Sequence, residues 1–355
     1  MHAPLPPEIL SRIVYFTAGP TLLALCRSCK ALLGPVQAKL YSTLQLGEPH
    51  QCFSVCSILA TSPHLAQLVK CLWIYVDTRR TQHRSALPHQ YWLAVRRALE
   101  QMSELQSLVF FDSTLQSTWV IDPANIPFHL IDAKIKLRWD FTLARFLENQ
   151  KSLQQLHIVD HPEPPDTPTL ASEALKELTV FEGPAFVAVH LINSPITHIQ
   201  ACIGPPYERT LPQLLACIPS WTALRALNLL NMPEGPNADE FASEAINLIA
   251  TYAPKLLHLG TLPLPCKNRG TYHRALSRLH YLRVFEVELH MWSPQPPVNM
   301  QRSLASELRI YCPSLEMVAM WLPQNRRFNW HVDPETGDWS YYLQQGQQDS
   351  LWRMP

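Results

Sequence analysis

Two short stretches near the start of the chain carry apolar residues at helical spacing. The first follows a pair of prolines and places Ile9 and Ile13 on one face, and the second follows a Gly-Pro break and places Leu22 and Leu25 on one face. A third helix is expected over residues 36–41. Three helices of this length have little core of their own, so we expect the module to pack against the chain that follows.

From residue 51 onward the pattern changes to a repeated phrase, L-x-x-L-x-φ, in which φ is apolar and which follows a helical stretch. The clear copies start at Leu105, Leu153, Leu175 and Leu224, and looser copies start at Leu65, Ile196, Leu256, Leu282 and Leu315. A helix followed by a strand, repeated at an irregular interval of about 20 to 50 residues, is typical of a solenoid with variable insertions. The pattern predicts parallel strands on a concave face and helices on a convex face.

Residues 328–342 carry a different pattern. Two short segments rich in aromatic residues flank the turn sequence Asp333-Pro334-Glu335-Thr336-Gly337. This arrangement predicts a β-hairpin. We expect Trp330 and Trp339 to cover the core of the last repeat, because a solenoid has to close its terminal face.

The composition fits a folded protein and argues against some partners. Hydrophobic residues make up 47% of the 355 positions, and 29 Lys and Arg balance 29 Asp and Glu. Because no net positive charge favours a polyanion, we expect no nucleic-acid partner and no acidic membrane surface. The chain has neither a run of about 18 apolar residues nor a signal-like start, so we expect no membrane span and a cytoplasmic or nuclear location.

The glycines are too widely spaced for three common site motifs. The closest pair, Gly337 and Gly346, is nine positions apart, whereas dinucleotide-binding, phosphate-binding and nucleophile-elbow motifs need glycines within about five positions. Cys26 and Cys29 form one CxxC pair, which is either half of a zinc or redox site or part of an apolar helix face; with no second pair, the apolar face is the preferred interpretation. The sequence therefore predicts a protein that is not an enzyme and holds no metal and no cofactor.

The start of the chain resembles an F-box. The resemblance is carried by Leu5-Pro6-Pro7-Glu8-Ile9-Leu10 with Ile13, by residues 22–30 and by residues 40–46. The whole chain is similar to the F-box-like leucine-rich repeat proteins frequent in basidiomycete fungi. This resemblance implies that the first helices dock on the Skp-type linker subunit of a cullin-based (SCF) ubiquitin ligase and that the repeats hold a protein substrate of unknown identity. The residues expected to face the linker are Leu5, Pro6, Ile9, Leu10, Ile13, Leu22 and Leu25.

Pattern and resemblance together predict an α/β fold in three parts. These are a three-helix F-box-like module over residues 1–46, an irregular leucine-rich repeat solenoid over 51–325, and a C-terminal hairpin cap and tail over 326–355. We expect the chain to act as a substrate-recruiting adaptor. The alternative is a leucine-rich repeat scaffold for protein interactions whose F-box is degenerate and purely structural, because an amphipathic stripe is equally the core of a helical cap.

The fifth and seventh positions of each phrase are expected to face the concave side. The candidates for substrate contact there are Phe111, His157, Phe181, Glu286, Glu288 and Trp321. Exposed aromatic side chains on a rigid surface are common in protein recognition sites, but proline-rich inserts could also fold over this row and bury it. The row contains no Lys or Arg, which argues against an RNA or a phosphorylated ligand.

Overall fold

The computed structural model describes residues 5–75, 87–159, 163–205, 207–233, 238–345 and 351–353. Over these residues the protein is a mixed α/β fold with thirteen strands, most of them parallel to their neighbours, as the repeated phrase predicts. The chain falls into two compact units, one that runs to Val159 and includes Glu163–Glu177, and one that runs from Leu178 onward. Each unit is described by itself.

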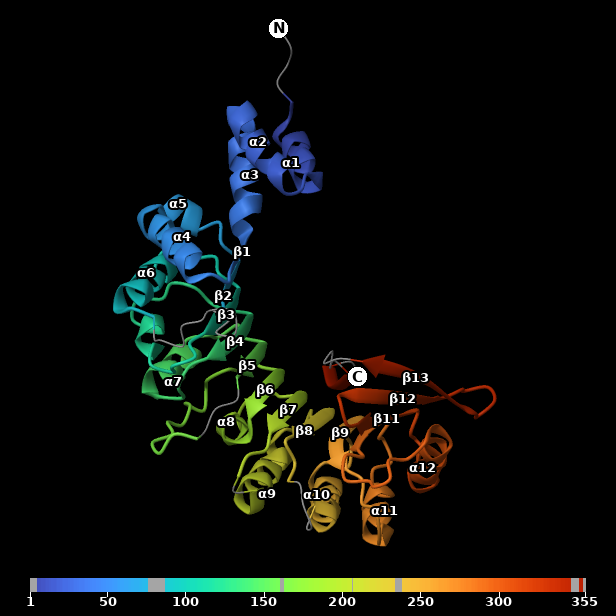
Figure 1. The fold of residues 1–355 in the computed structure, drawn as a ribbon. Coiled ribbons are helices and arrows are strands. Elements are labelled where there is room, and N and C mark those ends of the chain that lie inside the picture. Colours follow the sequence, from blue (N-terminus) through green and yellow to red (C-terminus); the bar gives the residue numbers. More distant parts are fainter. Residues whose placement is uncertain are drawn as a thin grey trace. The chain divides into compact units, whose positions relative to one another are not determined.

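The N-terminal helical module of the first unit comprises three helices (Figure 1): α1 (Pro7–Phe16), α2 (Pro20–Ser28) and α3 (Lys30–Ser42). Prolines occupy the first turns of α1 and α2, where a missing N–H breaks no helical hydrogen bond. The third helix is longer than expected, because Pro35 lies inside it instead of ending the second helix. Lys39 Nζ donates to the carbonyl oxygens of Val14, Tyr15 and Thr17, at 2.6 to 3.0 Å, and so neutralises the C-terminal end of α1.

The rest of the first unit is a parallel sheet with helices on one face (Figure 1). The strands are β1 (Thr43–Leu46), β2 (Cys71–Ile74), β3 (Ser107–Phe111), β4 (Asp132–Lys136) and β5 (Gln155–Ile158), paired in chain order. The helices are α4 (Pro49–Thr61), α5 (Pro63–Ala66), α6 (His89–Leu99), η1 (Thr118–Ile121) and α7 (Phe141–Glu148). Because β1 belongs to the sheet, the sheet begins within the first 46 residues, and α3 leads directly into it while contacting α5.

The second unit repeats this plan and ends in a hairpin. Parallel strands β6 (Val180–Pro184), β7 (His198–Cys202), β8 (Ala226–Leu230), β9 (His258–Pro263), β10 (Val284–Glu288) and β11 (Met317–Leu322) are followed by antiparallel β12 (Arg326–Val332) and β13 (Trp339–Gln345). The helices are α8 (Ala185–His190), α9 (Tyr207–Cys217), η2 (Ile218–Ser220), α10 (Ala238–Tyr252), α11 (Gly270–Leu276), α12 (Val298–Tyr311) and η3 (Leu351–Arg353). Helices α8 to α12 lie on one face of the sheet (Figure 1). In both units we call the other side the open face.

The fourth position of each phrase forms a continuous row on the helix-covered face. In the second unit Phe181, Ile199, Leu227, Leu259, Phe285 and Val318 are partners of one another from strand to strand, and all are fully buried. In the first unit Leu72, Leu108, Ala133 and Leu156 form the equivalent row. Burial of this row fixes the register of the strands, since a slip of one residue would turn it to the open face.

Strand β4 was not expected from the sequence. β4 lies within a copy of the phrase, Leu130-x-x-Ala133-x-Ile135, whose fourth position is alanine. This copy lies between the phrases that start at Leu105 and Leu153. Leu130, Ala133 and Ile135 are fully buried. The small alanine at the fourth position gives this copy a weaker hydrophobic signal than the copies with a larger apolar side chain there.

The expected register at β6 is wrong. The phrase was placed at Leu175, which put Phe181 on the open face, but Phe181 pairs with Ile199 in the buried row and is 0% exposed. The phrase therefore starts three residues later, at Leu178, which is also buried. Two overlapping L-x-x-apolar spacings occur here, and only the packing against α8 and its neighbours distinguishes them.

The predicted C-terminal hairpin is confirmed. β12 and β13 pair antiparallel around residues 333–338, and β12 pairs with β11 so that Val318 lies opposite Trp330. Trp330 is 2% exposed, its Nε1 donates to Gln301 Oε1 on α12 at 3.3 Å, and its ring lies 4.8 Å from that of Tyr341. Trp339 is only half-buried. The two tryptophans therefore differ in their contribution to the end of the sheet.

We predict that Trp330→Ala lowers the free energy of unfolding by about 3 to 5 kcal/mol, because it removes a buried indole and leaves a cavity between β12 and α12. Trp339→Ala is the matched control and should cost clearly less, since its side chain is half-buried. Urea unfolding of both variants measures the difference. Equal losses would contradict the assignment of Trp330 as the residue that closes the sheet.

Candidate partner-binding surfaces

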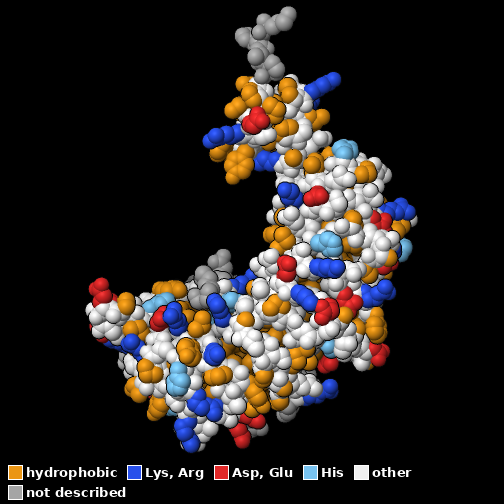
Figure 2. All heavy atoms as spheres, turned by 180° about the vertical axis from the view of Figure 1, so that it is seen from behind, with side chains coloured by type: hydrophobic (Ala, Val, Ile, Leu, Met, Phe, Trp, Pro, Cys, Tyr) orange, Lys and Arg blue, Asp and Glu red, His pale blue; other side chains and the backbone are white. Residues whose placement is uncertain are grey.

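Helix α1 presents a row of exposed apolar side chains. Leu5, Ile9 and Ile13 are 55%, 44% and 41% exposed, and Phe16, one turn further along, is 73% exposed. Pro6 is exposed beside them. Ile9, Ile13 and Phe16 lie three or four positions apart and therefore share one face of α1. Leu5 precedes the helix, and we call these four side chains together the α1 stripe. Figure 2 shows hydrophobic side chains gathered on the surface of the N-terminal module.

The other residues expected to face a linker subunit lie in the module's own core. Leu22 is 5% exposed and packs with Val14, Leu32 and Val36. Leu10 and Leu25 are partly buried against the same cluster. The expectation is corrected for Leu22, because the inner face of α2 has to cover α1 and α3. Of the seven residues, Leu5, Pro6, Ile9 and Ile13 are the ones that are exposed.

On the open face of the first unit, aromatic and basic side chains lie together. Phe111 on β3 is half-buried, and its ring contacts that of Tyr75 at 5.4 Å. Lys134 Nζ lies 5.9 Å from the Phe111 ring, and Lys136 is the strand partner of Phe111 on β4. His157 is the partner of Lys134 on β5 and is half-buried.

Two residue types were therefore missing from the expected row. Lys134 and Lys136 are half-buried on the open face, so the statement that the row contains no Lys is wrong for the first unit. The cause is the unrecognised strand β4. Trp73 on β2, 43% exposed, was also missed. The phrase expected at Leu65 starts at Val69 instead, because Leu65 lies in α5 and Leu72 pairs with Leu108 in the buried row, and Trp73 is its fifth position.

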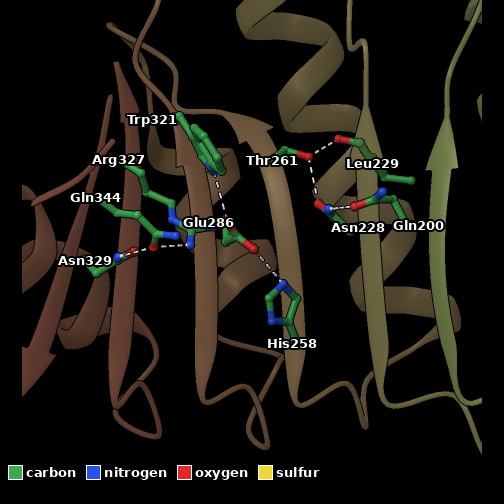
Figure 3. Close-up of polar contacts among 10 residues, drawn as sticks. All are labelled: Gln200, Asn228, Leu229, His258, Thr261, Glu286, Trp321, Arg327, Asn329 and Gln344. Carbon is green, nitrogen blue, oxygen red and sulfur yellow. Dashed lines mark hydrogen bonds and ion pairs between the residues drawn. The ribbon is translucent and has the colours of Figure 1, made fainter. Parts of the chain in front are cut away.

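The open face of the second unit is different, because polar side chains are buried there. The carboxylate of Glu286 on β10 is 0% exposed. Its Oε1 lies 3.0 Å from Nε2 of His258 on β9, its Oε2 accepts a hydrogen bond of 2.8 Å from Nε1 of Trp321 on β11, and Nη1 of Arg327 on β12 lies 3.5 Å from Oε2 (Figure 3). A buried carboxylate requires such partners, since an uncompensated charge in the interior is very unfavourable.

The expected roles of Glu286 and Trp321 change accordingly. Glu286 faces the open side, as its position in the phrase predicts, but it cannot offer a negative field to a partner because neighbouring strands cover and neutralise it. Trp321 is half-buried, its N–H is bonded to Glu286, and the guanidinium of Arg327 lies 4.8 Å from its ring. Glu288 is half-buried on β10. The sequence pattern did not indicate that the hairpin places Arg327 on this face, beside Glu286 and Trp321.

A second part of the polar cluster spans β7 to β9 (Figure 3). Asn228 on β8 is fully buried, donates from Nδ2 to Gln200 Oε1 at 2.7 Å, and accepts at Oδ1 from the hydroxyl of Thr261 at 2.8 Å. The same hydroxyl donates to the carbonyl oxygen of Leu229. Gly260 is the strand partner of Asn228, and a methyl group at Gly260 would overlap Asn228 Oδ1 and lie 3.0 Å from His258 Nε2. Only glycine leaves room for the Asn228 amide.

Thr261 shows the backbone consequence of this arrangement. Its φ is 55°, a conformation that β-branched residues rarely adopt. The pairing of β9 with β10 shifts at this point, so that Leu259 and Leu262 both remain in the buried row. The bulge thus turns the Thr261 hydroxyl into the polar cluster while the apolar register is kept on both sides.

The cluster contains a histidine and a carboxylate but little access to solvent. His258 is 1% exposed and Glu286 0%, so a substrate cannot reach the pair without movement of the residues that cover it. Among the described residues, no group of three or more His, Cys, Asp or Glu side chains could hold a metal ion. Cys26 and Cys29 do not share a buried face, since Cys29 is exposed. None of the described helices is both long and apolar enough to cross a membrane.

The covering of this face includes a segment that the sequence did not single out. Trp352, in the short η3 turn, is 0% exposed and lies against β7, β8 and β9. Arg353 Nη2 lies 2.6 Å from Oε2 of Glu182 on β6. An isolated Trp-Arg pair near the C-terminus carries no periodic signal, so only the folded structure identifies it.

The chain matches no family model, and no curated protein matches it.

We predict that Gly260→Ala lowers the free energy of unfolding by about 1 to 3 kcal/mol, because the added methyl group has to displace the hydrogen-bonded Asn228 amide. Asn228→Ala removes the overlap. In a double-mutant cycle monitored by urea unfolding, Gly260→Ala should therefore cost less in the Asn228→Ala background than in the wild-type chain. Strictly additive losses would show that Gly260 and Asn228 do not interact.

We predict that folding is destabilised as the pH falls below about 6.5, the usual histidine value. Burial lowers the pKa of His198, of His273 and of His331. Their imidazoles therefore take up protons more readily in the unfolded chain. As a result, the free energy of unfolding keeps its full value above about pH 6.5 and decreases as the pH falls from there toward their lower folded pKa values. The urea concentration at the unfolding midpoint should be lower at about pH 5.5 than at about pH 7.5. His198→Gln should reduce that fall, because the glutamine side chain does not titrate.

Proposed function

We propose that this protein is a non-enzymatic adaptor that joins two protein partners. The N-terminal module binds a Skp-type linker subunit of a cullin ubiquitin ligase through the α1 stripe, and the open face of the repeats binds the protein to be ubiquitinated. The observation that carries the proposal is the α1 stripe itself. The large apolar side chains of Ile9, Ile13 and Phe16 on α1, and of Leu5 just before it, are exposed, although the other side of the helix already packs in the module's own core.

Packing supports a protein partner at the α1 stripe. Contiguous exposed apolar residues are unfavourable in water unless another surface covers them. The core formed by Val14, Leu22, Leu32 and Val36 closes the module without using the stripe. Folding alone therefore gives no reason for large apolar residues at these positions, whereas docking on an apolar groove of a linker subunit does.

The two open faces support the second half of the proposal. In each unit the helices lie on one side of the strands only (Figure 1). In the first unit the open face presents Trp73, Tyr75 and Phe111 with Lys134 and Lys136. Aromatic side chains on a rigid surface contribute strongly to protein recognition.

A scaffold without a linker subunit is the second candidate. It is favoured by the buried positions of Leu22 and, in part, of Leu10 and Leu25, which show that much of the F-box-like pattern serves the module's own core. On this alternative the repeats still bind protein partners, and the α1 stripe binds a different surface. The two candidates differ only in what the stripe captures.

We predict that Ile9→Asp abolishes capture of a purified Skp-type linker subunit. Burying a carboxylate in an apolar interface without a partner costs several kcal/mol, roughly enough to eliminate a micromolar contact. Ser11→Asp is the matched control, because it adds the same charge to an exposed position on another side of the same helix. Isothermal titration measures both, and circular dichroism checks that the helices remain. Wild-type binding by Ile9→Asp, or no binding by the wild-type chain, would favour the scaffold.

A further inference from the structure

The open faces of the two units differ in how far their central residues are exposed. In the first unit, the open-face residue Trp73 on β2 is 43% exposed. In the second unit, Gln200, Asn228 and His258 on β7 to β9 are 7%, 0% and 1% exposed. A sheet face that carries no helices is solvated unless another segment covers it. The chain must therefore supply a cover for the middle of the second open face.

The cover over β7 to β9 includes the chain's own segment Leu351–Arg353. This segment lies against all three strands. The indole of Trp352 is completely buried there, although its residue follows the last strand of the sheet and belongs to no repeat. An indole buries more surface than almost any other side chain, so Trp352 makes the largest contribution to this contact. We call the surface of β7 to β9 on which it lies the seat of Trp352.

The contact also selects for positive charge. Arg353 pairs with Glu182 on β6 at 2.6 Å, and its guanidinium lies 4.9 Å from the Trp352 ring. Glu182 is on the open face, one strand away from the seat of the indole. An aromatic residue followed by an arginine is therefore matched twice, once by burial and once by charge.

The fit of this segment is incomplete. The indole nitrogen of Trp352 is buried without a hydrogen-bond acceptor, and so is Nε2 of His198 at the start of β7. A buried donor that loses its bond to water without gaining another is destabilising. The segment thus has the contacts of a ligand but leaves polar atoms that a better-matched ligand could satisfy.

We propose that the open face of β6 to β9 is a peptide-binding surface that the chain's own Leu351–Arg353 occupies, and that its external ligand is a protein segment with a large aromatic residue followed by arginine. This inference rests on the substrate-binding half of the proposed function and names the substrate class. The partner segment competes with Trp352 for the same seat. Because a tethered segment acts at an effective concentration in the millimolar range, only a segment with additional contacts displaces it.

The test uses a fluorescein-labelled peptide with the sequence of residues 346–355 and measures its anisotropy against the full-length chain. Trp352→Ala empties the seat, so this variant should bind the peptide about tenfold or more tightly than the wild-type chain, whose seat is occupied. A peptide with alanine in place of its tryptophan should lose that binding. Trp339→Ala is the matched control: it removes a half-buried tryptophan from β13 and should bind the peptide no better than the wild-type chain.

A second variant covers the case in which Trp352→Ala does not fold. Arg353→Glu keeps the indole and reverses the charge that faces Glu182, so it should weaken the intramolecular contact and raise peptide affinity several-fold. In the same background, Glu182→Arg restores an opposite pair and should return affinity to the wild-type level. The inference is overturned if the folded Trp352→Ala variant does not bind the peptide, or if that variant is unfolded and Arg353→Glu binds no better than wild type.

Linker capture separates this inference from the function on which it rests. Trp352→Ala should capture the linker subunit normally, and Ile9→Asp in the Trp352→Ala background should still bind the peptide, because the α1 stripe and the seat of Trp352 belong to different units. Linker capture without peptide binding would reject only the peptide-binding surface. Peptide binding without linker capture would reject only the ubiquitin-ligase half of the proposed function.

Discussion

Burial of one apolar row, with one side chain from each of the strands β2 to β11, keeps the parallel strands of each unit in register. The row is formed by the fourth position of each repeat and packs under the helices, as Leu227, Leu259 and Phe285 illustrate. Each such side chain contributes roughly 1.5 to 3 kcal/mol when it leaves water. Because side chains alternate along a strand, this burial also decides which residues point to the open face. The functional surfaces are therefore a consequence of the core.

The open face of the second unit meets a constraint that the first does not. Its residues are covered, so every charge on it needs a partner within the protein. Glu286 meets this requirement by contacts from β9, β11 and β12, and Arg327 reaches it because the hairpin extends the sheet beyond the last parallel strand. The hairpin thus does more than close the end of the core. It also completes the polar cluster on the opposite side.

In the N-terminal module, one amphipathic pattern supplies both core residues and exposed apolar residues. Val14 and Leu22 form its core, while Ile9 and Ile13 remain exposed on the neighbouring face of α1. Both sets recur at helical spacing, so the pattern cannot assign either role. The assignment follows from where α2 and α3 lie, and it is this geometry that reduces seven candidate partner residues to four.

The sequence by itself determined the class of fold. The repeated phrase established alternating helices and parallel strands, and the turn at residues 333–337 established the final hairpin, because hydrophobic period and turn chemistry are local properties. Local signals failed where a permissive position broke the phrase, as at Ala133, or where two spacings overlapped, as at Leu175 and Leu178.

Only the tertiary structure decided which open-face residues are accessible. Glu286 is buried by contacts that reach as far along the chain as Arg327, and Asn228 lies in a face covered by Trp352. Burial depends on what else the chain places over a residue, and that information is absent from the residue's own neighbourhood in the sequence.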